Sequence, residues 1–315
     1  MTGRRYDTIS FLSDFGHADE FVGVVHSVIR SIAPQVGVID ITHGIPRHDT
    51  RAGGLALARA ASYLNPGVVI AVVDPGVGTD RRSIALEVGD GMSVLIGPDN
   101  GLLAPAVGLV GGATRAFEIT SVEHRLPTAG GATFDGRDVF GPAAAHLCNG
   151  VPITEIGTEI DPATLMPGVL PISRFEEGPR GPELVCEVLW VDHFGNCQLN
   201  VDPLEIIDVA GTGGEVVVEV GAGSATPDER IGVRVDAYDQ IPHGRIGLVV
   251  DSSGLLSLAV ARGSAASDLQ LGEGIEIRIR SLAESDRGGV VTSVQLGSRP
   301  ENAPSTEPVD STGTE

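Results

Sequence analysis

The chain has 315 residues, 42% of them hydrophobic and only 4% aromatic, so it can form two domains with cores of Val, Ile, Leu and Ala. Its formal net charge of −21 argues against binding to nucleic acid or to an anionic membrane and favours a cationic small molecule. All 21 basic residues are arginines, which excludes a Schiff-base lysine and the lysine of a Walker loop.

The three cysteines, Cys148, Cys186 and Cys197, are scattered along the chain without C-x-x-C spacing. This pattern speaks against a disulfide framework or a zinc site and favours a reducing, cytoplasmic compartment. The polar N-terminus lacks the apolar core of a signal peptide, and no apolar run approaches the ~18 residues of a membrane helix. We therefore expect a soluble protein.

Apolar strands alternate with helices through the first half of the chain. The predicted strands are 8–12, 36–41, 68–73, 84–86 and 94–96, and the predicted helices are 21–32, 50–64 and 139–149. This alternation predicts an α/β domain over residues 1–170 with a doubly wound, mostly parallel sheet. The first loop carries Asp14, Asp19 and Glu20 and lacks G-x-G-x-x-G, which speaks against a dinucleotide cofactor.

The second half of the chain has a different pattern. Proline, glycine and charge are concentrated before residue 182, and we expect a linker at 171–182. The predicted strands that follow are 184–192, 215–220, 231–235, 246–250, 255–260, 275–279 and 290–296. Short strands with glycine-rich turns predict a smaller β-barrel domain over 183–298. The segment 299–315 has three prolines and no apolar core, so we expect it to be disordered.

Asp74 lies where the buried strand 68–73 ends, at the edge of an α/β sheet where ligands bind. Gly76 and Gly78 allow a tight turn, and Arg81 follows seven residues after Asp74, close enough to pair with its carboxylate. The pair has two interpretations. It is either a functional carboxylate kept ionised by the arginine or a structural ion pair that closes the turn.

A second polar group, Asp135, Arg137 and Asp138, precedes the predicted helix 139–149. Two acidic residues that flank one arginine are compatible with a catalytic group. Because Asp138 directly precedes the helix, the pattern also fits an N-cap with its salt bridge, and we favour that interpretation.

Five motifs that occur in order resemble one family, the S-adenosyl-L-methionine (SAM) hydrolases, also called SAM hydroxide adenosyltransferases, which are relatives of the fluorinases and chlorinases. The motifs are Ser13-Asp14-Phe15-Gly16, Thr42-His43-Gly44-Ile45-Pro46, Val73-Asp74-Pro75-Gly76-Val77-Gly78-Thr79, Gly97-Pro98-Asp99-Asn100-Gly101-Leu102-Leu103 and Val191-Asp192-His193-Phe194-Gly195-Asn196. The resemblance runs from about Thr8 to Leu296. It implies hydrolysis of SAM to adenosine and methionine, and a homotrimer with SAM held between subunits. It also implies that neither a cofactor nor a metal is needed.

The same resemblance assigns roles to individual residues. The residues that it implies for catalysis are Asp74, Arg81 and Asp135. The residues that it implies for substrate binding are Asp14, His48, Asp192, Asn196, Tyr238, Ser252, Ser257, Val260 and Arg262. Asp14 is expected at the ribose hydroxyls, Tyr238 at the adenine and Ser252 at the methionine carboxylate. Asp74 and Arg81 are expected to orient the attacking water.

The chain departs from the family pattern at three positions. Asp135 stands where the hydrolases carry a histidine, so either Asp135 is a base or Asp74 and Arg81 act as a dyad. Ser253 replaces an arginine of the halogenating relatives, and Ser257 replaces a glutamate that is frequent in the hydrolases. Asp74 in place of the halogenases' tyrosine also disfavours halide chemistry. A non-catalytic protein that binds adenosine or SAM remains the alternative from another class, with a SAM-dependent halogenase as a third.

Overall fold

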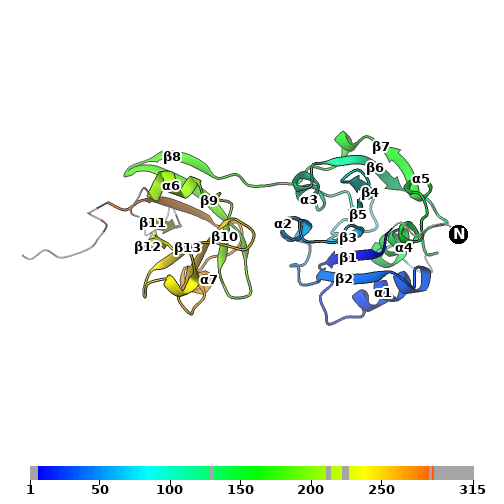
Figure 1. Ribbon diagram of the computed structural model, residues 1–315, viewed down its shortest axis with the longest axis horizontal. Coiled ribbons are helices and arrows are strands. Elements are labelled where there is room, and N and C mark those ends of the chain that lie inside the picture. The colour runs from blue at the N-terminus through cyan, green and yellow to red at the C-terminus, as the bar shows by residue number, and fades with distance from the viewer. Residues whose placement is uncertain (1–5, 128–130, 211–213, 222–226, 284–285, 287–315) are drawn as a thin grey trace, which may run out of the picture.

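The computed structural model describes residues 6–127, 131–210, 214–221, 227–283 and 286. They form two lobes that lie side by side and are joined by an extended segment (Figure 1). Within these residues, no helix combines the length and the apolar character needed to cross a membrane.

The N-terminal lobe is built on a seven-stranded sheet with the order β2-β1-β3-β5-β4-β6-β7. Its strands are β1 (Thr8–Ser13), β2 (Gly37–Thr42), β3 (Val68–Val72), β4 (Ser83–Val88), β5 (Ser93–Pro98), β6 (Ala113–Ile119) and β7 (Gly157–Ile160). Strands β2, β1, β3 and β5 run parallel to one another, whereas the pairs β5–β4, β4–β6 and β6–β7 are antiparallel. Only β4 and β7 therefore run against the other five, and the predicted mostly parallel sheet is confirmed.

Helices cover both faces of this sheet, as expected for a doubly wound fold (Figure 1). One face packs against α1 (Phe21–Ile32) and α4 (Gly141–Cys148), and the other against α2 (Thr50–Ala61) and α3 (Ala104–Leu109). The short π-helix η1 (Gly136–Phe140) leads into α4, which is followed by α5 (Ile153–Ile156) and later by the 3-10 helix η2 (Pro162–Thr164). Because every residue of β3 is buried, alternate side chains enter the two cores, and the strand shows the continuous apolar run seen in the sequence.

The direction in which the chain crosses the sheet reverses between β1 and β3. From β1 the chain moves outward to β2, then returns to form β3 on the opposite side of β1. In open α/β sheets, the crevice outside the carboxyl ends of strands at such a reversal is the usual ligand site. The loops that follow β1 and β3 are therefore the expected ligand-binding region of this lobe.

The C-terminal lobe is a barrel of seven strands that closes where β10 pairs with β9. In chain order the elements are β8 (Arg174–Gly178), β9 (Gly181–Val191), β10 (Cys197–Leu199), α6 (Glu205–Ala210), β11 (Glu215–Val220), β12 (Asp228–Arg234), η4 (Tyr238–Gln240), β13 (Ile246–Val250), β14 (Leu256–Val260), α7 (Ala265–Asp268) and β15 (Glu276–Ser281). Strand β8 pairs only with β9 and flanks the barrel. The predicted strand 290–296 and the predicted tail 299–315 lie outside the described residues.

The predicted linker 171–182 is largely a hairpin. Strand β8 and the first residues of β9 occupy it, and the irregular connection between the lobes spans 165–173 instead. The prolines suggested a linker, but Pro179 lies in the two-residue turn and Pro182 pairs with Glu177 on an outer strand. Proline is tolerated at both places because neither requires a central ladder hydrogen bond.

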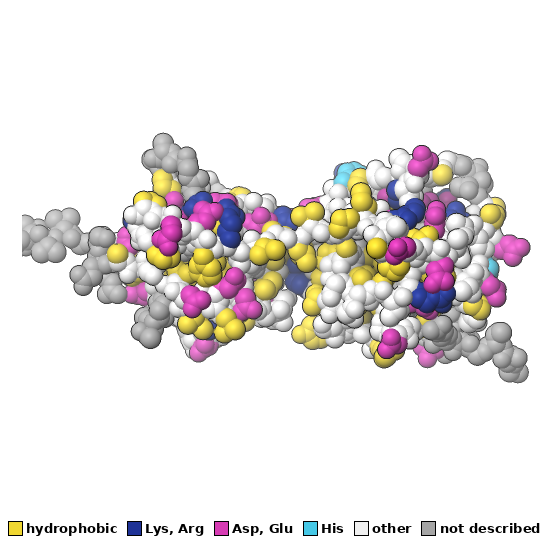
Figure 2. Space-filling view, turned by 90° about the horizontal axis from the view of Figure 1, so that it is seen from above, with side chains coloured by type: hydrophobic (Ala, Val, Ile, Leu, Met, Phe, Trp, Pro, Cys, Tyr) yellow, Lys and Arg dark blue, Asp and Glu magenta, His cyan; other side chains and the backbone are white. Residues whose placement is uncertain are grey.

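Two arginines of α2 join the lobes. Arg51 forms an ion pair with Glu187 of β9. Arg59 donates to the amide oxygen of Gln198 at 3.3 Å, and its guanidinium lies 5.2 Å from the centre of the Trp190 ring. Hydrophobic side chains also gather at the junction between the lobes (Figure 2), where a hollow of about 880 Å³ is lined by apolar residues of α2 and α3 and by the turn 252–255.

Candidate active site

The loops after β1 and β3 bring Asp14 and Asp74 to the same edge of the sheet. The backbone N–H of Asp14 donates to the carbonyl of Val72 at 3.3 Å, so the two strand ends stay in register. Both carboxylates therefore lie at the reversal point of the sheet, where the fold favours a ligand.

Asp74 forms a tight pair with Arg81, as the spacing of the loop predicts. Nε of Arg81 donates to both carboxylate oxygens of Asp74, at 3.0 and 2.9 Å, and Nη2 adds a second contact to Oδ2. The Asp74 side chain is only 5% exposed. Burial of a carboxylate is costly unless a cation and hydrogen bonds compensate its desolvation, and Arg81 supplies both.

Asp135 brings a second carboxylate to the same guanidinium. Its Oδ2 accepts from Nη2 of Arg81, although the two residues are 54 positions apart in the chain, and its side chain is 17% exposed. Nη1 of Arg81 donates to the hydroxyl of Ser83 at 2.7 Å. Asp135 is thus held in place by Arg81, and within the described residues its Oδ1 accepts no hydrogen bond. That oxygen is free to accept a proton or a hydrogen bond from a bound water.

The electrostatics of Arg81 follow from this arrangement. Burial, the largest single influence, acts to lower the pKa of Arg81, but the hydrogen bonds and charges of Asp74 and Asp135 together outweigh it and raise that pKa. Arg81 is therefore a permanent cation. One guanidinium shared by two carboxylates leaves the cluster with a net negative charge, which suits a cationic substrate.

Glycine at position 78 allows the segment of Asp135 to approach this loop. Gly78 has φ +78°, and a Cβ there would lie only 2.8 Å from the carbonyl oxygen of Ala132. On the other side, Phe134 packs edge-on against Phe15 at 5.6 Å. These two contacts fix Asp135 beside Arg81.

The favoured interpretation of Asp138 as an N-cap is wrong. The helical segment begins at Gly136 as a π-turn, so Asp138 lies inside it, buried and paired with Arg137 at 2.6 Å. Asp135 occupies the N-cap position but makes no capping hydrogen bond with its side chain. A π-turn adds one residue to a helical turn, and nothing in the sequence signals it.

The carboxylate of Asp14 contacts the backbone of His48 and not its imidazole. The N–H of His48 donates to Oδ2 of Asp14 at 2.9 Å, while the imidazole is exposed. His48 has φ +66°, which directs its N–H toward Asp14, and the next residue, Asp49, caps α2 by accepting from the N–H of Ala52. This contact orients the Asp14 carboxylate, and within the described residues its Oδ1 accepts no hydrogen bond and is open to a ligand.

The C-terminal candidates are ordered by a different kind of contact. Oδ1 of Asp192 accepts from the backbone N–H groups of Phe194 and Asn196, and Oδ2 accepts from the Asn196 amide at 2.8 Å. Asp192 therefore organises its own turn. Burial first, then the negative charges of Asp192 and Asp251, raises the pKa of Tyr238.

The remaining candidates lie on the turn 251–254, on β14 and at Arg262, two residues after β14 ends. Ser252 is exposed and lines the hollow between the lobes, next to Ser253, whose N–H binds Asp251. Val260 is half-buried and Arg262 is exposed with φ +57°. Ser257 is only 2% exposed because it pairs with Val249 and Gln198 in the middle of the sheet, so within this chain it is covered.

The structure thus divides the candidates into two groups. Asp14, Asp74, Arg81 and Asp135 gather at one edge of the N-terminal sheet, with the backbone of His48 beside Asp14, and the other candidates belong to the barrel. Among the described residues, no hydrogen bond or ion pair joins the two groups. Sequence reasoning missed Ser83 and Phe134, which support Arg81 and Asp135, since their roles depend on contacts between distant segments.

Comparison with known proteins gives a consistent assignment. Residues 9–157 match the SAM hydroxide adenosyltransferase N-terminal domain, and residues 186–278 match the C-terminal domain of the same family. The chain is 41% identical over 271 residues to an (R)-S-adenosyl-L-methionine hydrolase of Salinispora tropica, which covers 86% of this chain and 97% of the relative. It is also 41% identical to a protein of that name from Thermus thermophilus, with 86% and 98% covered. A fluorinase of Nocardia brasiliensis is 26% identical, with 89% and 98% covered.

Solved structures share this fold. An uncharacterized conserved protein of Thermotoga maritima superposes with a TM-score of 0.75 at 31% identity and covers 86% of this chain and 99% of its own. A conserved hypothetical protein of Thermus thermophilus gives a TM-score of 0.64 at 37% identity, with the same coverage. From the two matched domains and these relatives, we conclude that the chain belongs to the SAM hydroxide adenosyltransferase family.

Proposed function

We propose that this protein hydrolyses S-adenosyl-L-methionine to adenosine and L-methionine. The observation that carries the proposal is the bridge of Arg81 between Asp74 and Asp135 at the reversal point of the sheet. The names of the relatives that are 41% identical to this chain support the same activity.

The reaction needs little from the protein beyond positioning. The oxygen of a water attacks C5′ of the ribose, the bond from C5′ to the sulfonium sulfur breaks, and the sulfur keeps the electron pair as a neutral thioether. One proton is released from the water. A sulfonium is already an activated leaving group, so the main tasks are to hold a water in line and to accept its proton. Asp74 fixed by Arg81, together with the free Oδ1 of Asp135, is suited to both tasks.

Incubation with SAM tests the proposal directly. We expect equal amounts of adenosine and methionine, measured by liquid chromatography, and incorporation of ¹⁸O from labelled water into the adenosine 5′-hydroxyl. Chloride or fluoride should give no 5′-halogenated adenosine, since an ionised Asp74 repels an anionic nucleophile. Saturable SAM binding without turnover would favour a binding protein, and a halogenated product would favour a halogenase.

We also propose that the substrate is the R epimer at the sulfonium, the form in the names of the two relatives. The experiment is a comparison of kcat/KM for the two purified epimers. The R epimer should react faster, and equal rates or a preference for S would contradict the assignment.

A homotrimer with each active site shared between two subunits is the assembly that we propose. In its support, the N-terminal and C-terminal candidates share no hydrogen bond within the described part of one chain. Phe194, next to Asp192, is 76% exposed, which leaves a large apolar surface for a neighbour to cover.

Complementation tests this assembly. At a SAM concentration near the wild-type KM, Asp74→Ala would be inactive through its loss of kcat and Asp192→Ala would be weak through its raised KM, but mixed trimers made by co-expression would contain some sites with both intact halves and regain activity. Sedimentation should report three chains. A monomer, or mixed assemblies as inactive as the single variants, would contradict the proposal.

A further inference from the structure

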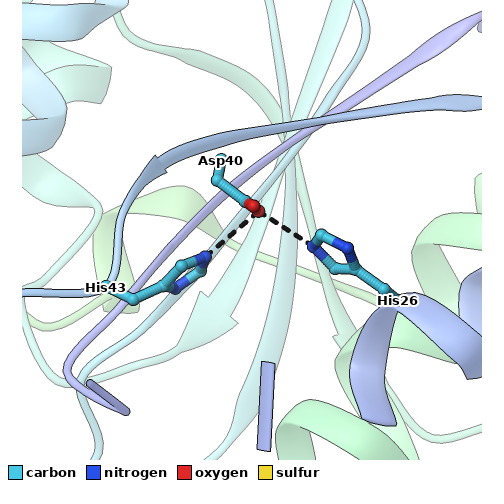
Figure 3. Close-up of side chains that lie close together, drawn as sticks. All are labelled: His26, Asp40 and His43. Carbon is cyan, nitrogen blue, oxygen red and sulfur yellow. Dashed lines mark hydrogen bonds and ion pairs between the residues drawn. The ribbon is translucent and has the colours of Figure 1, made fainter. Parts of the chain in front are cut away.

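A group of ionisable side chains outside the candidate active site joins α1, β2 and the loop after β2. Nε2 of His26 lies 2.8 Å from Oδ1 of Asp40, and Nε2 of His43 lies 3.1 Å from the same oxygen (Figure 3). One potential ligand atom from each residue falls within 4.8 Å of the other two. We propose that His26, Asp40 and His43 bind a divalent transition-metal ion.

The burial of His43 distinguishes this group from an ion pair on the protein surface. Its side chain is only 1% exposed, and its buried Nε2, although close to Asp40, makes no aligned hydrogen bond to any residue that the structure describes. An imidazole nitrogen left in this state is costly unless another partner occupies it. A metal ion at Nε2 would satisfy the nitrogen.

The other nitrogen of His43 already has the partner that metal-bound histidines usually have. Nδ1 lies 2.7 Å from the hydroxyl of the buried Ser13. A hydrogen bond from Nδ1–H to a polar atom fixes the tautomer that presents Nε2 as a ligand and orients the ring.

The ligand set indicates the class of metal. Two imidazole nitrogens with one carboxylate favour zinc, cobalt or nickel over calcium or magnesium, which prefer oxygen. Ligands of a tetrahedral zinc at ~2.1 Å stand roughly 3.4 Å from one another. Here the two histidine nitrogens lie 2.8 and 3.1 Å from Asp40 and within 4.8 Å of each other. His26 is 33% exposed and Asp40 more so, which provides a route for the ion and a fourth position for water.

The site was not visible in the sequence because its ligands have no characteristic spacing. His26 is brought to Asp40 by the packing of α1 on β2, and only Asp40 and His43 are close in the chain. The scattered cysteines, from which no zinc site was expected, are all buried in the structure and take no part in it.

Titration of zinc into metal-free, tag-free protein tests the proposal. We expect one saturable zinc per chain by calorimetry, an intense visible absorption band when cobalt is used, and a zinc-dependent rise in Tm. His26→Gln and Asp40→Asn, two variants at partly exposed positions, should each weaken zinc binding at least about tenfold and remove the rise in Tm.

A matched control is His124→Gln. His124 also bonds to a serine, Ser121 at 2.8 Å, and lies against a second histidine, His146, but no carboxylate completes that pair into a ligand group among the described residues. This variant should bind zinc like the wild type. The proposal is overturned if wild-type protein shows no saturable zinc binding, if both His26→Gln and Asp40→Asn bind zinc normally, or if only His124→Gln loses it.

Discussion

The two halves of the candidate active site are ordered in different ways. At the edge of the N-terminal sheet, Arg81 connects Asp74 with Asp135, which comes from a segment 54 residues away. In the barrel, Asp192 and Asn196 bond mainly to their own turn, while Ser252 and Tyr238 are exposed. The N-terminal half is held by contacts between distant segments, whereas the barrel half consists of turns that form hydrogen bonds mainly within themselves and carry exposed side chains.

This difference indicates which half positions the attacking water and which half binds the substrate. A group that must hold a water within a few tenths of an ångström needs support from several directions, and Arg81 receives it from Asp74, Asp135 and Ser83. Exposed turns can adapt to a ligand but cannot position a reacting atom so strictly. We therefore expect N-terminal substitutions to lower kcat and C-terminal substitutions to raise KM.

The largest effect should come from Asp74→Ala. The change removes the carboxylate that acts on the water, so we expect kcat to fall by roughly 10³-fold while SAM binds within about tenfold of wild type. Stopped assays of adenosine release and equilibrium binding of SAM measure the two quantities.

The matched control for Asp74→Ala is Asp80→Ala, an exposed acid of the same loop. It should retain wild-type kcat. A variant at Asp74 that turned over at nearly the wild-type rate would remove the water-positioning role and with it the contrast between the two halves.

Asp14→Asn should act on binding although it lies in the N-terminal half. The carboxylate is oriented by the N–H of His48, and loss of its charge weakens a hydrogen bond to the ribose by ~1.5–3 kcal/mol, about 10- to 150-fold in adenosine affinity. Calorimetry with adenosine measures it, and Asp19→Asn in the same loop is the control. An unchanged dissociation constant would take Asp14 out of the ribose site.

The variants Asp135→Asn and Asp135→His test what Asp135 contributes to the cluster that it forms with Asp74 and Arg81. Because Arg81 stays bound to Asp74, we expect Asp135→Asn to lower kcat by only about tenfold, and to remove the acid limb of the pH–rate profile if the carboxylate takes the proton. Recovery of the rate in Asp135→His, without that limb, would instead indicate a hydrogen-bond donor. A silent Asp135→Asn would leave Asp74 and Arg81 as a dyad.

The smallest effect is expected in the barrel, from Ser252→Ala. One neutral hydrogen bond is worth ~0.5–1.5 kcal/mol, so KM should rise by about two- to tenfold with kcat unchanged. Ser253→Ala, an equally exposed neighbour, should change neither value. A fall in kcat for Ser252→Ala would show that the barrel also positions the reacting atoms.

Local patterns predicted many of the elements, though not α3, β6, β7 or β10, and they predicted the pair of Asp74 with Arg81. The pair could be predicted because the apolar run of β3, the short loop after it and both charged residues lie within fourteen consecutive residues, 68–81. The partnership of Asp135 with Arg81 depends instead on how η1 packs against the β3 loop, with Gly78 against Ala132, and no periodicity encodes such a contact. The same limit explains Asp138, which lies inside a π-turn, and the hairpin found in place of a linker.

The backbone conformation of His48 has a consequence for how this position can vary in evolution. What reaches Asp14 is the main-chain N–H of residue 48, presented at φ +66°, and not the imidazole. Asparagine, aspartate and glycine adopt this left-handed conformation as readily as histidine, whereas valine and isoleucine do not. We therefore expect that substitution of His48 by any of those three residues keeps the contact that orients Asp14.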